Sequence, residues 1–376
     1  MKILFLTNAA SSLYGFRKEL IKKLIQQGHS IDAFISEATT EELELVKKLG
    51  VNPILYELNR GGLNPFADLW ATYKLAKKIK QLSPDIAFPY FAKPIVFGTL
   101  AAKWARVPRI VGMLDGLGYA FTEQPEGLSF KAKLLRIIQV LLYKWSLPKL
   151  DKLILLNKDD FADLIIKYNI KTKQTEILGG IGLDLNEYVY SPVEVVKPPI
   201  KFLFIGRLLK EKGIHEFIAA ARKVKQSYPD TVFTVLGSID KANMGALSEN
   251  ALNELIRSGI IEYPGQVTDV SRWISDHHIF VLPSYREGVP RSTQEAMAIG
   301  RPVITTNVAG CRETVEDNLN GFLVAPWDAD ELAEKMIYFI QHPEMIKKMG
   351  EESYQIAKEK FDSIKVNEKL VKMILP

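Results

Sequence analysis

The chain alternates short apolar runs with segments whose apolar residues recur at helical spacing, and this alternation restricts the possible folds more than any other feature. Short apolar runs between polar boundaries are typical of buried strands. Strands that alternate with helices form parallel sheets covered by helices on both faces. In the first half of the chain, strands are expected at 2–7, 31–35, 84–88, 109–113, 152–156 and 174–178.

A second series of strands follows the proline-containing segment 191–199. Its strands are expected at 201–205, 231–236, 260–263, 279–282, 302–305 and 321–323. Two such series predict an α/β protein with two doubly wound domains, here placed at 1–190 and 200–355. The length of 376 residues agrees with two domains.

The composition is that of a globular protein, with 47% apolar and 25% charged residues. Cys311 is the single cysteine, which excludes an internal disulfide and a metal site of several cysteines. The chain enters an apolar strand directly after Met1 and Lys2, so no signal peptide is recognised. No stretch reaches the roughly 18 apolar residues that cross a bilayer. We therefore expect a cytoplasmic protein.

Positive charge is concentrated in the first half of the chain. Residues 1–190 contain 26 Lys and Arg against 19 Asp and Glu, whereas the remainder contains 23 against 25. This excess indicates an anionic partner, which could be a membrane surface, a nucleic acid or a phosphorylated acceptor. A solvated surface without any partner would account for the same modest excess.

The segment 130–147 combines an apolar face with basic residues. Its apolar residues recur at helical spacing and include Leu134, Leu141, Leu142 and Trp145. Lys131, Lys133, Arg136 and Lys144 lie among them. This pattern is typical of a helix that lies in the plane of a membrane surface. A core helix whose basic side chains extend outward would show the same pattern.

The strongest functional signal is the loop 284–295, which follows an expected strand and leads into a helix. Loops at the carboxyl ends of parallel strands bind ligands in open α/β sheets. Gly288 allows close approach of the backbone, and Ser292 lies at the helix start, where free N–H groups favour a diphosphate. Glu287 and Glu295, with seven residues between them, can hold two ends of one elongated ligand.

A second signal follows the first strand of the second domain, in the sequence FIGRLLKEKG at 204–213. Arg207 and Lys212 are placed to meet an anion in the same crevice, Arg as a planar fork and Lys as a point charge. Two cations directed at a leaving diphosphate would stabilise the charge that develops as a glycosidic bond breaks.

The sequences GRLLKEKG and EGVPRSTQEAMAIGRPVI resemble the donor-binding half of family 4 retaining glycosyltransferases, which have the GT-B fold. The resemblance extends over the whole chain. In its first half, Tyr14-Gly15-Phe16-Arg17, Asn64-Pro65-Phe66 and Gly116-Leu117-Gly118 resemble enzymes that add N-acetylhexosamine to undecaprenyl-diphosphate-linked sugars of bacterial surface glycans and N-glycans. The resemblance implies two Rossmann-like domains that face each other across a cleft. It also implies that residues 356–376 form a helix that returns to the first domain.

The resemblance also implies roles for individual residues. Arg207 and Lys212 would bind the donor diphosphate, Glu295 the ribose hydroxyls and Glu287 the donor sugar. Asp115, where many relatives carry histidine, is a further candidate for the catalytic set. The other expected donor contacts are Gly15, Gly206, Gly237, Gln266, Val267, Gly288, Val289, Pro290 and Ser292.

The partners implied by the resemblance are a nucleotide sugar, expected to be UDP-linked, and a lipid-linked saccharide at the cytoplasmic face of the inner membrane. No nucleic acid is expected. No metal or other cofactor is expected. Asp328 and Asp330 resemble a metal-binding Asp-x-Asp motif, but they precede a helix start, where we expect Asp330 to be the cap and Asp328 to lie near it.

Two other functions fit a fold of this kind. One is a non-catalytic nucleotide-sugar-binding protein, because a fold does not determine a function. The other is a GT-B epimerase acting on UDP-N-acetylglucosamine. The joint presence of Arg207, Lys212, Glu287 and Glu295 favours the transferase.

Overall fold

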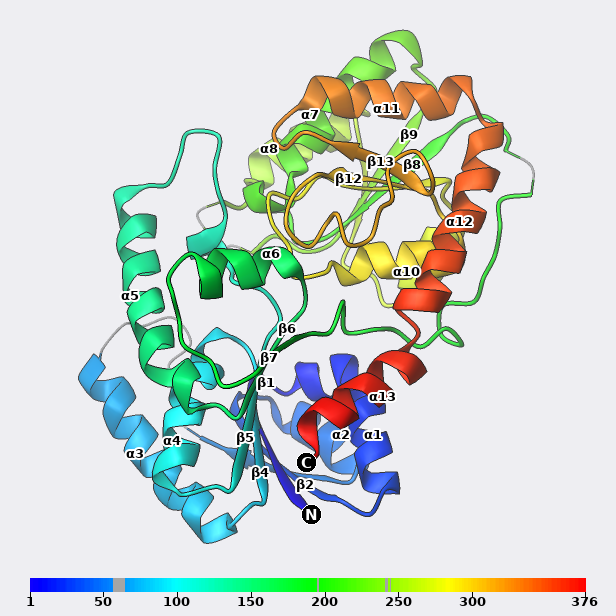
Figure 1. Ribbon diagram of the computed structural model, residues 1–376. Helices are drawn as coiled ribbons and strands as arrows, with labels where there is room; N and C mark the ends of the chain where they lie inside the picture. The colour runs from blue at the N-terminus through cyan, green and yellow to red at the C-terminus, as the bar shows by residue number, and fades with distance from the viewer. Residues whose placement is uncertain (57–64, 195, 241–242, 244) are drawn as a thin grey trace. The chain divides into compact units, whose positions relative to one another are not determined.

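The structure is a computed structural model that describes the chain except for residues 57–64, 195, 241–242 and 244, and except for the side chains of 65–67. The chain divides into two compact units (Figure 1). Unit 1 comprises Met1–Phe121, Ser129–Ile181 and Ser363–Pro376. Unit 2 comprises Thr122–Leu128 and Gly182–Asp362.

Unit 1 is built on a seven-stranded parallel sheet with the order β3-β2-β1-β4-β5-β6-β7. The strands are β1 (Lys2–Ala9), β2 (Ser30–Glu37), β3 (Val51–Leu55), β4 (Ile86–Pro89), β5 (Arg109–Leu114), β6 (Lys152–Leu155) and β7 (Thr175–Ile177). Strand β1 pairs with β2 on one side and β4 on the other, so the direction of winding reverses there.

The sequence pattern predicts six of these strands and misses β3. This strand contains Asn52 and Pro53, which are uncommon in strands. Proline lacks an N–H group and is tolerated at a sheet edge, and β3 is an edge strand that pairs only with β2 among the described residues. The edge position of β3 in the sheet, rather than the strand propensity of its residues, explains why this segment forms a strand.

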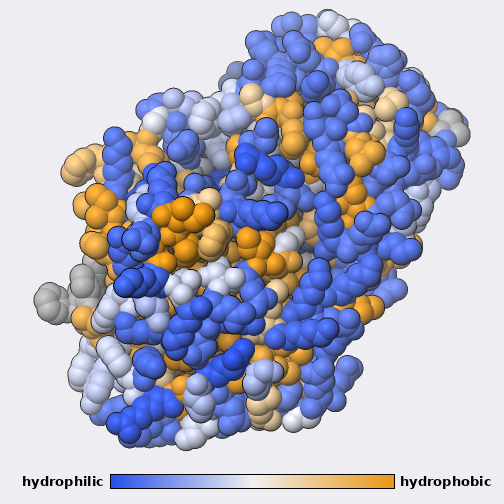
Figure 2. Space-filling view, in the orientation of Figure 1, coloured by the Kyte–Doolittle hydropathy of each residue, from blue (hydrophilic) through white to orange (hydrophobic). Residues whose placement is uncertain are grey.

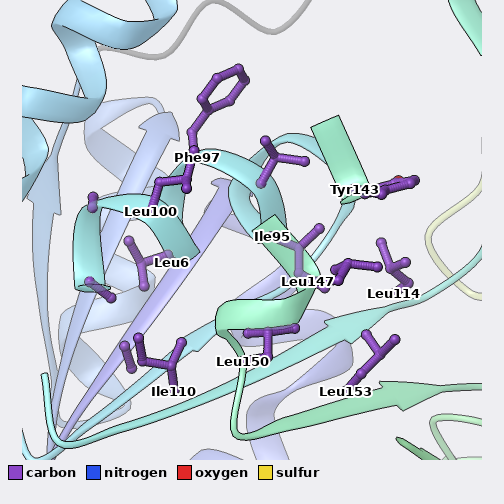
Figure 3. Close-up of a cluster of buried hydrophobic side chains, with 14 of the residues drawn as sticks. Leu6, Ile95, Phe97, Leu100, Ile110, Leu114, Tyr143, Leu147, Leu150 and Leu153 are labelled. Carbon is purple, nitrogen blue, oxygen red and sulfur yellow. The ribbon is translucent and has the colours of Figure 1, made fainter. Parts of the chain in front are cut away.

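Helices cover both faces of the first sheet (Figure 1). The α-helices of unit 1 are α1 (Lys18–Gln26), α2 (Thr40–Lys48), α3 (Pro65–Leu82), α4 (Thr99–Trp104), α5 (Phe130–Ser146), α6 (Lys158–Asp160) and α13 (Ser363–Ile374). Figure 3 shows side chains from the sheet, including Leu6, Ile110 and Leu153, packed against Ile95 and Leu147 of the covering layer. This packing buries the apolar faces that the sequence periodicity predicts.

Unit 2 contains a six-stranded parallel sheet with the order β10-β9-β8-β11-β12-β13. Its strands are β8 (Lys201–Ile205), β9 (Val232–Leu236), β10 (Glu262–Gly265), β11 (Ile279–Leu282), β12 (Val303–Thr306) and β13 (Gly321–Val324). Its α-helices are α7 (Ile214–Ser227), α8 (Glu249–Arg257), α9 (Val270–Ser275), α10 (Arg291–Ile299), α11 (Ala329–Gln341) and α12 (Glu344–Lys360). All six strands that the sequence predicts for this half are present.

The chain passes between the units at positions that differ from the sequence expectation. The main passage into unit 2 lies between Ile181 and Gly182 instead of near residue 190, and the return lies between Asp362 and Ser363 instead of near 356. Helix α13 packs within unit 1, where the Arg109 guanidinium donates hydrogen bonds to the carbonyl oxygens of Ile374 at 2.8 Å and Leu375 at 3.1 Å. A cation at a helix C-terminus also complements the helix dipole.

Candidate active site

Two loops meet at the carboxyl edge of the second sheet. One follows β8 and covers residues 206–213, and the other follows β11 and covers residues 283–290. Strands β8 and β11 are neighbours in the sheet, and the winding direction reverses between them. Open α/β sheets bind ligands at such a switch point. Both sequence signals of the second half therefore lie at the position where the topology favours a site.

Close backbone contacts hold the two loops together. The Tyr285 N–H donates to the carbonyl oxygen of Glu211 at 2.9 Å. Gly213 has a φ of +75°, and a Cβ on this residue would overlap the carbonyl oxygen of Pro283. Only glycine combines this backbone conformation with such a close approach. The loop that carries Lys212 is thus fixed against the loop that carries Glu287.

The Glu287 carboxylate is held by two donors. The Lys212 ammonium contacts its Oε1 at 2.5 Å, and the Ser284 hydroxyl donates to the same oxygen at 2.8 Å. The Glu287 N–H donates to Ala309 O at 3.0 Å, and a Cβ on the adjacent Gly310 would overlap the Glu287 carbonyl. The loop after β12 therefore fixes the backbone, while Lys212 and Ser284 orient the side chain.

The charge of Arg207 is more exposed to solvent than that of Lys212. The Arg207 side chain is 55% exposed, and its Nη1 contacts Asp240 Oδ2 at 3.0 Å. An exposed ion pair of this kind contributes little to stability, about 0–1 kcal/mol. An anion with several oxygens can therefore compete with Asp240 for the guanidinium at small energetic cost.

Helix α10 begins at the end of this loop, at Arg291. The first N–H groups of a helix lack partners within it and create a local positive potential. The Ser292 hydroxyl donates to the Ile205 carbonyl oxygen at 3.2 Å, so it connects the helix to the end of β8. Its expected contribution to donor binding consequently falls on its backbone N–H rather than on its hydroxyl.

Glu295 lies on the first turns of α10 and is only 8% exposed. Its Oε1 accepts hydrogen bonds from the Tyr188 hydroxyl at 2.8 Å and from Arg291 Nε at 2.9 Å. Burial raises the pKa of Glu295, and the hydrogen bonds from Arg291 and Tyr188 act in the opposite direction. Burial is the larger influence, so the pKa of Glu295 stays above its usual range despite these two hydrogen bonds.

The other candidates of unit 2 surround the same edge. Gly206 and Gly237 are in close contact, since a Cβ on Gly237 would overlap the Gly206 carbonyl oxygen. The Gly237 N–H in turn donates a hydrogen bond to the carbonyl oxygen of Gly265 at 3.0 Å. Next to Gly265, Gln266 is exposed and Val267 is half-buried. On the β11 side, Gly288 is half-buried, whereas Val289 and Pro290 are buried.

Two further candidates belong to unit 1. Gly15 is exposed on a turn of π-helix (Ser12–Phe16), and a Cβ on it would meet nothing within 4 Å. Asp115 follows β5, and Nη2 of the buried Arg17 contacts both of its carboxylate oxygens, at 2.8 and 3.1 Å. Of the motif Asn64-Pro65-Phe66, Asn64 and the side chains of Pro65 and Phe66 lie outside the described residues.

The aspartates of the Asp-x-Asp sequence form a helix start, with one difference from the expected pattern. Asp328, rather than Asp330, is the N-cap of α11, and its Oδ1 accepts from the N–H groups of Asp330 and Glu331. Asp330 pairs instead with Lys223. Within the described part of the chain, no three His, Cys, Asp or Glu side chains are grouped as metal ligands.

Three residues of the site are not singled out by the sequence pattern. Tyr188 reaches Glu295 from a distant segment, Asp240 pairs with Arg207, and Gly310 supports the Glu287 backbone. A glycine shortly after an expected strand is a signal that could have identified Gly310. Tyr188 and Asp240 have no local signal, because their roles depend on contacts between remote segments.

The two units and the site define a glycosyltransferase of GT-B fold, and the comparisons with known proteins agree with this class. The family model of glycosyl transferases group 1 matches residues 191–356, and that of glycosyl transferase 4-like proteins matches residues 2–157. The chain belongs to this family of glycosyltransferases, which confirms the resemblance found in its motifs.

Among its relatives is the N,N'-diacetylbacillosaminyl-diphospho-undecaprenol alpha-1,3-N-acetylgalactosaminyltransferase of Campylobacter jejuni, 31% identical over 91% of this chain and 90% of the relative. Another is the Escherichia coli UDP-Gal:alpha-D-GlcNAc-diphosphoundecaprenol alpha-1,3-galactosyltransferase, 27% identical over 72% of this chain and 69% of the relative. The crystal structure of Anabaena Alr3699/HepE with UDP and glucose has the same fold, with a TM-score of 0.75 at 20% identity, covering 99% of this chain and 98% of that one.

Proposed function

We propose that this enzyme transfers an N-acetylhexosamine, GalNAc or GlcNAc, from UDP to an undecaprenyl-diphosphate-linked saccharide, with retention of configuration, during assembly of a bacterial surface glycan or protein glycan. The observation that supports this substrate class is the 31% identity, over nine-tenths of both chains, to the Campylobacter jejuni enzyme. The site geometry supports the use of a nucleoside diphosphate.

The two cations of the site suit a departing diphosphate. Lys212 is held at the switch point by Glu287, and Arg207 is exposed on the same loop. As the bond between the sugar and the diphosphate breaks, negative charge grows on the leaving oxygen. Prepositioned cations stabilise that charge without reorganisation during the reaction. Glu287, oriented by Lys212 and Ser284, is then available to accept hydrogen bonds from sugar hydroxyls.

Retention is proposed to occur by attack from the face that the diphosphate leaves. A retaining glycosidase uses a carboxylate nucleophile about 5 Å from a second carboxyl group. Here Glu295 is engaged by Tyr188 and Arg291, and Asp115 is engaged by Arg17. In the proposed step, the acceptor oxygen bonds to the anomeric carbon as the bond to the diphosphate breaks. The acceptor proton passes to a diphosphate oxygen.

We further propose that the reaction requires no metal ion. Arg207, Lys212 and the N-terminus of α10 supply positive potential at one edge of the sheet. Their combined charge takes the role that a divalent cation has in other nucleotide-sugar enzymes.

One assay tests the donor, acceptor and metal requirements together. The purified enzyme is incubated with UDP-GalNAc or UDP-GlcNAc and a lipid-diphosphate-linked saccharide, with and without EDTA. We expect transfer to the saccharide in EDTA, with an anomeric configuration in the product that matches the donor. Loss of transfer in EDTA and recovery with Mn²⁺ or Mg²⁺ would refute the metal-free mechanism. Epimerised donor in the absence of acceptor would indicate the epimerase, and binding without turnover a non-catalytic protein.

A lipid-linked acceptor requires access to a membrane surface, and we propose that α5 provides it. No helix in the described part of the chain is both long and apolar enough to span a bilayer. Helix α5 nevertheless exposes a stripe of apolar side chains at helical spacing. Their exposed fractions are 82% for Phe130, 47% for Leu134, 57% for Ile137, 60% for Leu141 and 41% for Trp145. Figure 2 shows hydrophobic surface in the region that α5 occupies in Figure 1.

The basic residues of α5 differ in their orientation. Lys131, Lys133 and Lys144 are exposed and can meet anionic lipid. Arg136, expected to do the same, instead donates through Nε to the Ala120 carbonyl oxygen at 2.6 Å and is half-buried. Likewise Leu142 packs toward the core rather than outward. The proposed membrane surface therefore has three lysines and an apolar stripe that extends from Phe130 to Trp145.

Helix α3 adds aromatic residues to this side of unit 1. Trp70 and Tyr73 are 60% and 44% exposed, and their rings stack at 5.7 Å. Lys77 lies over the Tyr73 ring at 4.7 Å, and Lys74 over the Trp70 ring at 6.0 Å. Trp and Tyr prefer the interface between lipid and water, and lysine favours anionic headgroups. The features of both helices agree with peripheral binding at the cytoplasmic face of the inner membrane.

A further inference from the structure

Tyr188 connects a remote segment of the chain to the buried carboxylate of the site. It lies just after the chain enters unit 2, more than one hundred residues before Glu295. Its hydroxyl donates to Glu295 Oε1 at 2.8 Å. Burial and the neighbouring Glu295 carboxylate raise the pKa of Tyr188, so its hydroxyl remains a donor at neutral pH.

The segment that carries Tyr188 is anchored to unit 2 on both sides. Before it, the Leu183 N–H donates to Phe361 O at 2.9 Å, and after it, the Ser191 N–H donates to Ile299 O at 3.1 Å. Between these anchors, the N–H of Tyr188 donates to Asp184 O at 3.2 Å and closes a turn. The Tyr188 hydroxyl therefore has a fixed position relative to α10.

Arg291 and Tyr188 hold Glu295 in different ways. Arg291 lies four residues before Glu295 on α10, so their ion pair is local to one helix. Tyr188 approaches from outside the helix and donates to the same oxygen, Oε1. Two donors from different directions restrict the rotation of the carboxylate more than either donor alone. The second oxygen, Oε2, then has a defined position.

We propose that Tyr188 is a positioning residue for nucleotide recognition, which fixes Glu295 so that Oε2 accepts hydrogen bonds from the ribose diol of the donor. This inference rests on the proposed function, in which Glu295 binds the ribose. Tyr188 acts through Glu295 and does not touch the reacting atoms. Its hydrogen bond also favours the ionised form of the buried Glu295 carboxylate, because it opposes the effect of burial on the pKa.

The test compares UDP with 2′,3′-dideoxy-UDP, which lacks the diol. Dissociation constants are measured by calorimetry for the wild type, for Tyr188→Phe and for Tyr190→Phe. Tyr190 is a matched control on the same segment, whose ring stacks on Tyr354 at 4.1 Å. We expect the wild type to prefer UDP, and Tyr188→Phe to reduce this preference about 5- to 10-fold, since a hydrogen bond to a charged group is lost. Tyr190→Phe should retain the wild-type preference.

Kinetics give a second, independent readout. Tyr188→Phe should raise the KM for the nucleotide sugar with little change in kcat, because ribose contacts are made equally in the ground state and the transition state. The groups that act on the Glu295 carboxylate are Arg291, Tyr188 and Glu187. Loss of the Tyr188 hydrogen bond raises the pKa of Glu295 further, so the acidic limb of kcat/KM should move to higher pH.

Two results would overturn the inference, and they can be told apart. If Tyr188→Phe weakens UDP and 2′,3′-dideoxy-UDP equally, Tyr188 has a structural role only and the proposed function stands. If the wild type binds both nucleotides equally, Glu295 does not contact the ribose, and the proposed donor geometry fails together with the role of Tyr188.

Discussion

At the scale of single residues, each charged group of the site has a partner in the protein that fixes its position. Glu287 is held by Lys212 and Ser284, and Arg207 is held more loosely by Asp240. The two residues differ in exposure, since the Arg207 side chain is 55% exposed and the Glu287 side chain is 12% exposed. The half-buried pair of Lys212 and Glu287 provides fixed geometry, and the exposed Arg207 provides a charge that can move toward a ligand.

Removal of either cation should reduce turnover far more than it reduces stability. Arg207→Ala or Lys212→Ala is expected to lower kcat by roughly 10²-fold or more, the cost of one lost contact to transition-state charge. Steady-state kinetics with the nucleotide sugar give the measurement, and Arg222→Ala, an exposed arginine on α7, is the matched control. Near-wild-type kcat in either variant would contradict the assignment of that residue to the diphosphate.

Gly15 offers a test in which folding and binding can be separated. A methyl group there would meet nothing within 4 Å, so Gly15→Ala should leave the melting temperature unchanged. If the diphosphate approaches this turn, the same methyl group should lower kcat/KM about tenfold or more by displacing the donor. Gly310→Ala is the contrasting variant, because its Cβ would overlap the Glu287 carbonyl and should lower both stability and activity. Unchanged kinetics in Gly15→Ala would remove Gly15 from the donor site.

At the scale of secondary-structure elements, a histidine joins the starts of two neighbouring strands. The Lys201 N–H at the start of β8 donates to Nδ1 of His278, which precedes β11, at 3.0 Å. This nitrogen must be unprotonated to accept. Burial, aided by the charges of Arg301 and Lys201 and by His277, lowers the pKa of His278 to about 4.

This histidine should make the stability of the protein depend on pH. In the unfolded chain His278 has its ordinary pKa of 6.5, whereas in the folded protein its pKa is about 4. Between these two pH values, the unfolded state therefore binds more protons than the folded state. The contribution of His278 is therefore complete above pH 6.5 and is lost as the pH falls toward about 4. His278→Asn retains an acceptor without the titration and should flatten the decline of the melting temperature over this window. His215→Asn, on the exposed face of α7, should show the wild-type slope; an unchanged slope in His278→Asn would refute this role of His278.

At the scale of the whole molecule, the first half of the chain combines an excess of positive charge with exposed apolar residues. Residues 1–190 carry the positive excess, and the exposed apolar residues of α3 and α5 lie there too. Figure 1 shows both helices on one side of the first sheet, with α1 and α2 on the other. A surface of this composition favours an anionic lipid bilayer over a neutral one.

Binding to vesicles should depend on the lysines of α5. We expect the wild type to sediment with vesicles of anionic phospholipid at low salt and to dissociate as salt is added, because each lysine near the surface contributes about 1 kcal/mol. Replacing Lys131, Lys133 and Lys144 by Gln should abolish most of this binding. The matched control replaces Lys22, Lys47 and Lys48 of α1 and α2, which are also exposed.

Two results would contradict the membrane surface. Failure of the wild type to sediment with anionic vesicles at low salt would indicate that α5 is an ordinary helix of the protein surface. An equal loss of binding in both lysine variants would indicate attraction by overall charge, without a specific surface. The UDP affinity of each variant, which depends on the proposed donor site and not on α5, verifies that the protein remains folded.

The sequence alone determined those features that depend on local pattern. Alternating apolar runs predicted two parallel sheets, because the burial of each strand is encoded in its own residues. The motifs around Arg207, Lys212, Glu287 and Glu295 predicted a candidate site, because each motif lies within one loop and its adjoining helix.

The tertiary structure decided what depends on contacts between remote segments. It placed β3 at the sheet edge, where Pro53 is tolerated, and joined Arg17 to Asp115, Arg207 to Asp240 and Tyr188 to Glu295. It also turned Arg136 inward, where the sequence pattern predicts an outward charge. Sequence periodicity specifies which face of an element is apolar, but only the packing of other segments fixes the partner of each polar group.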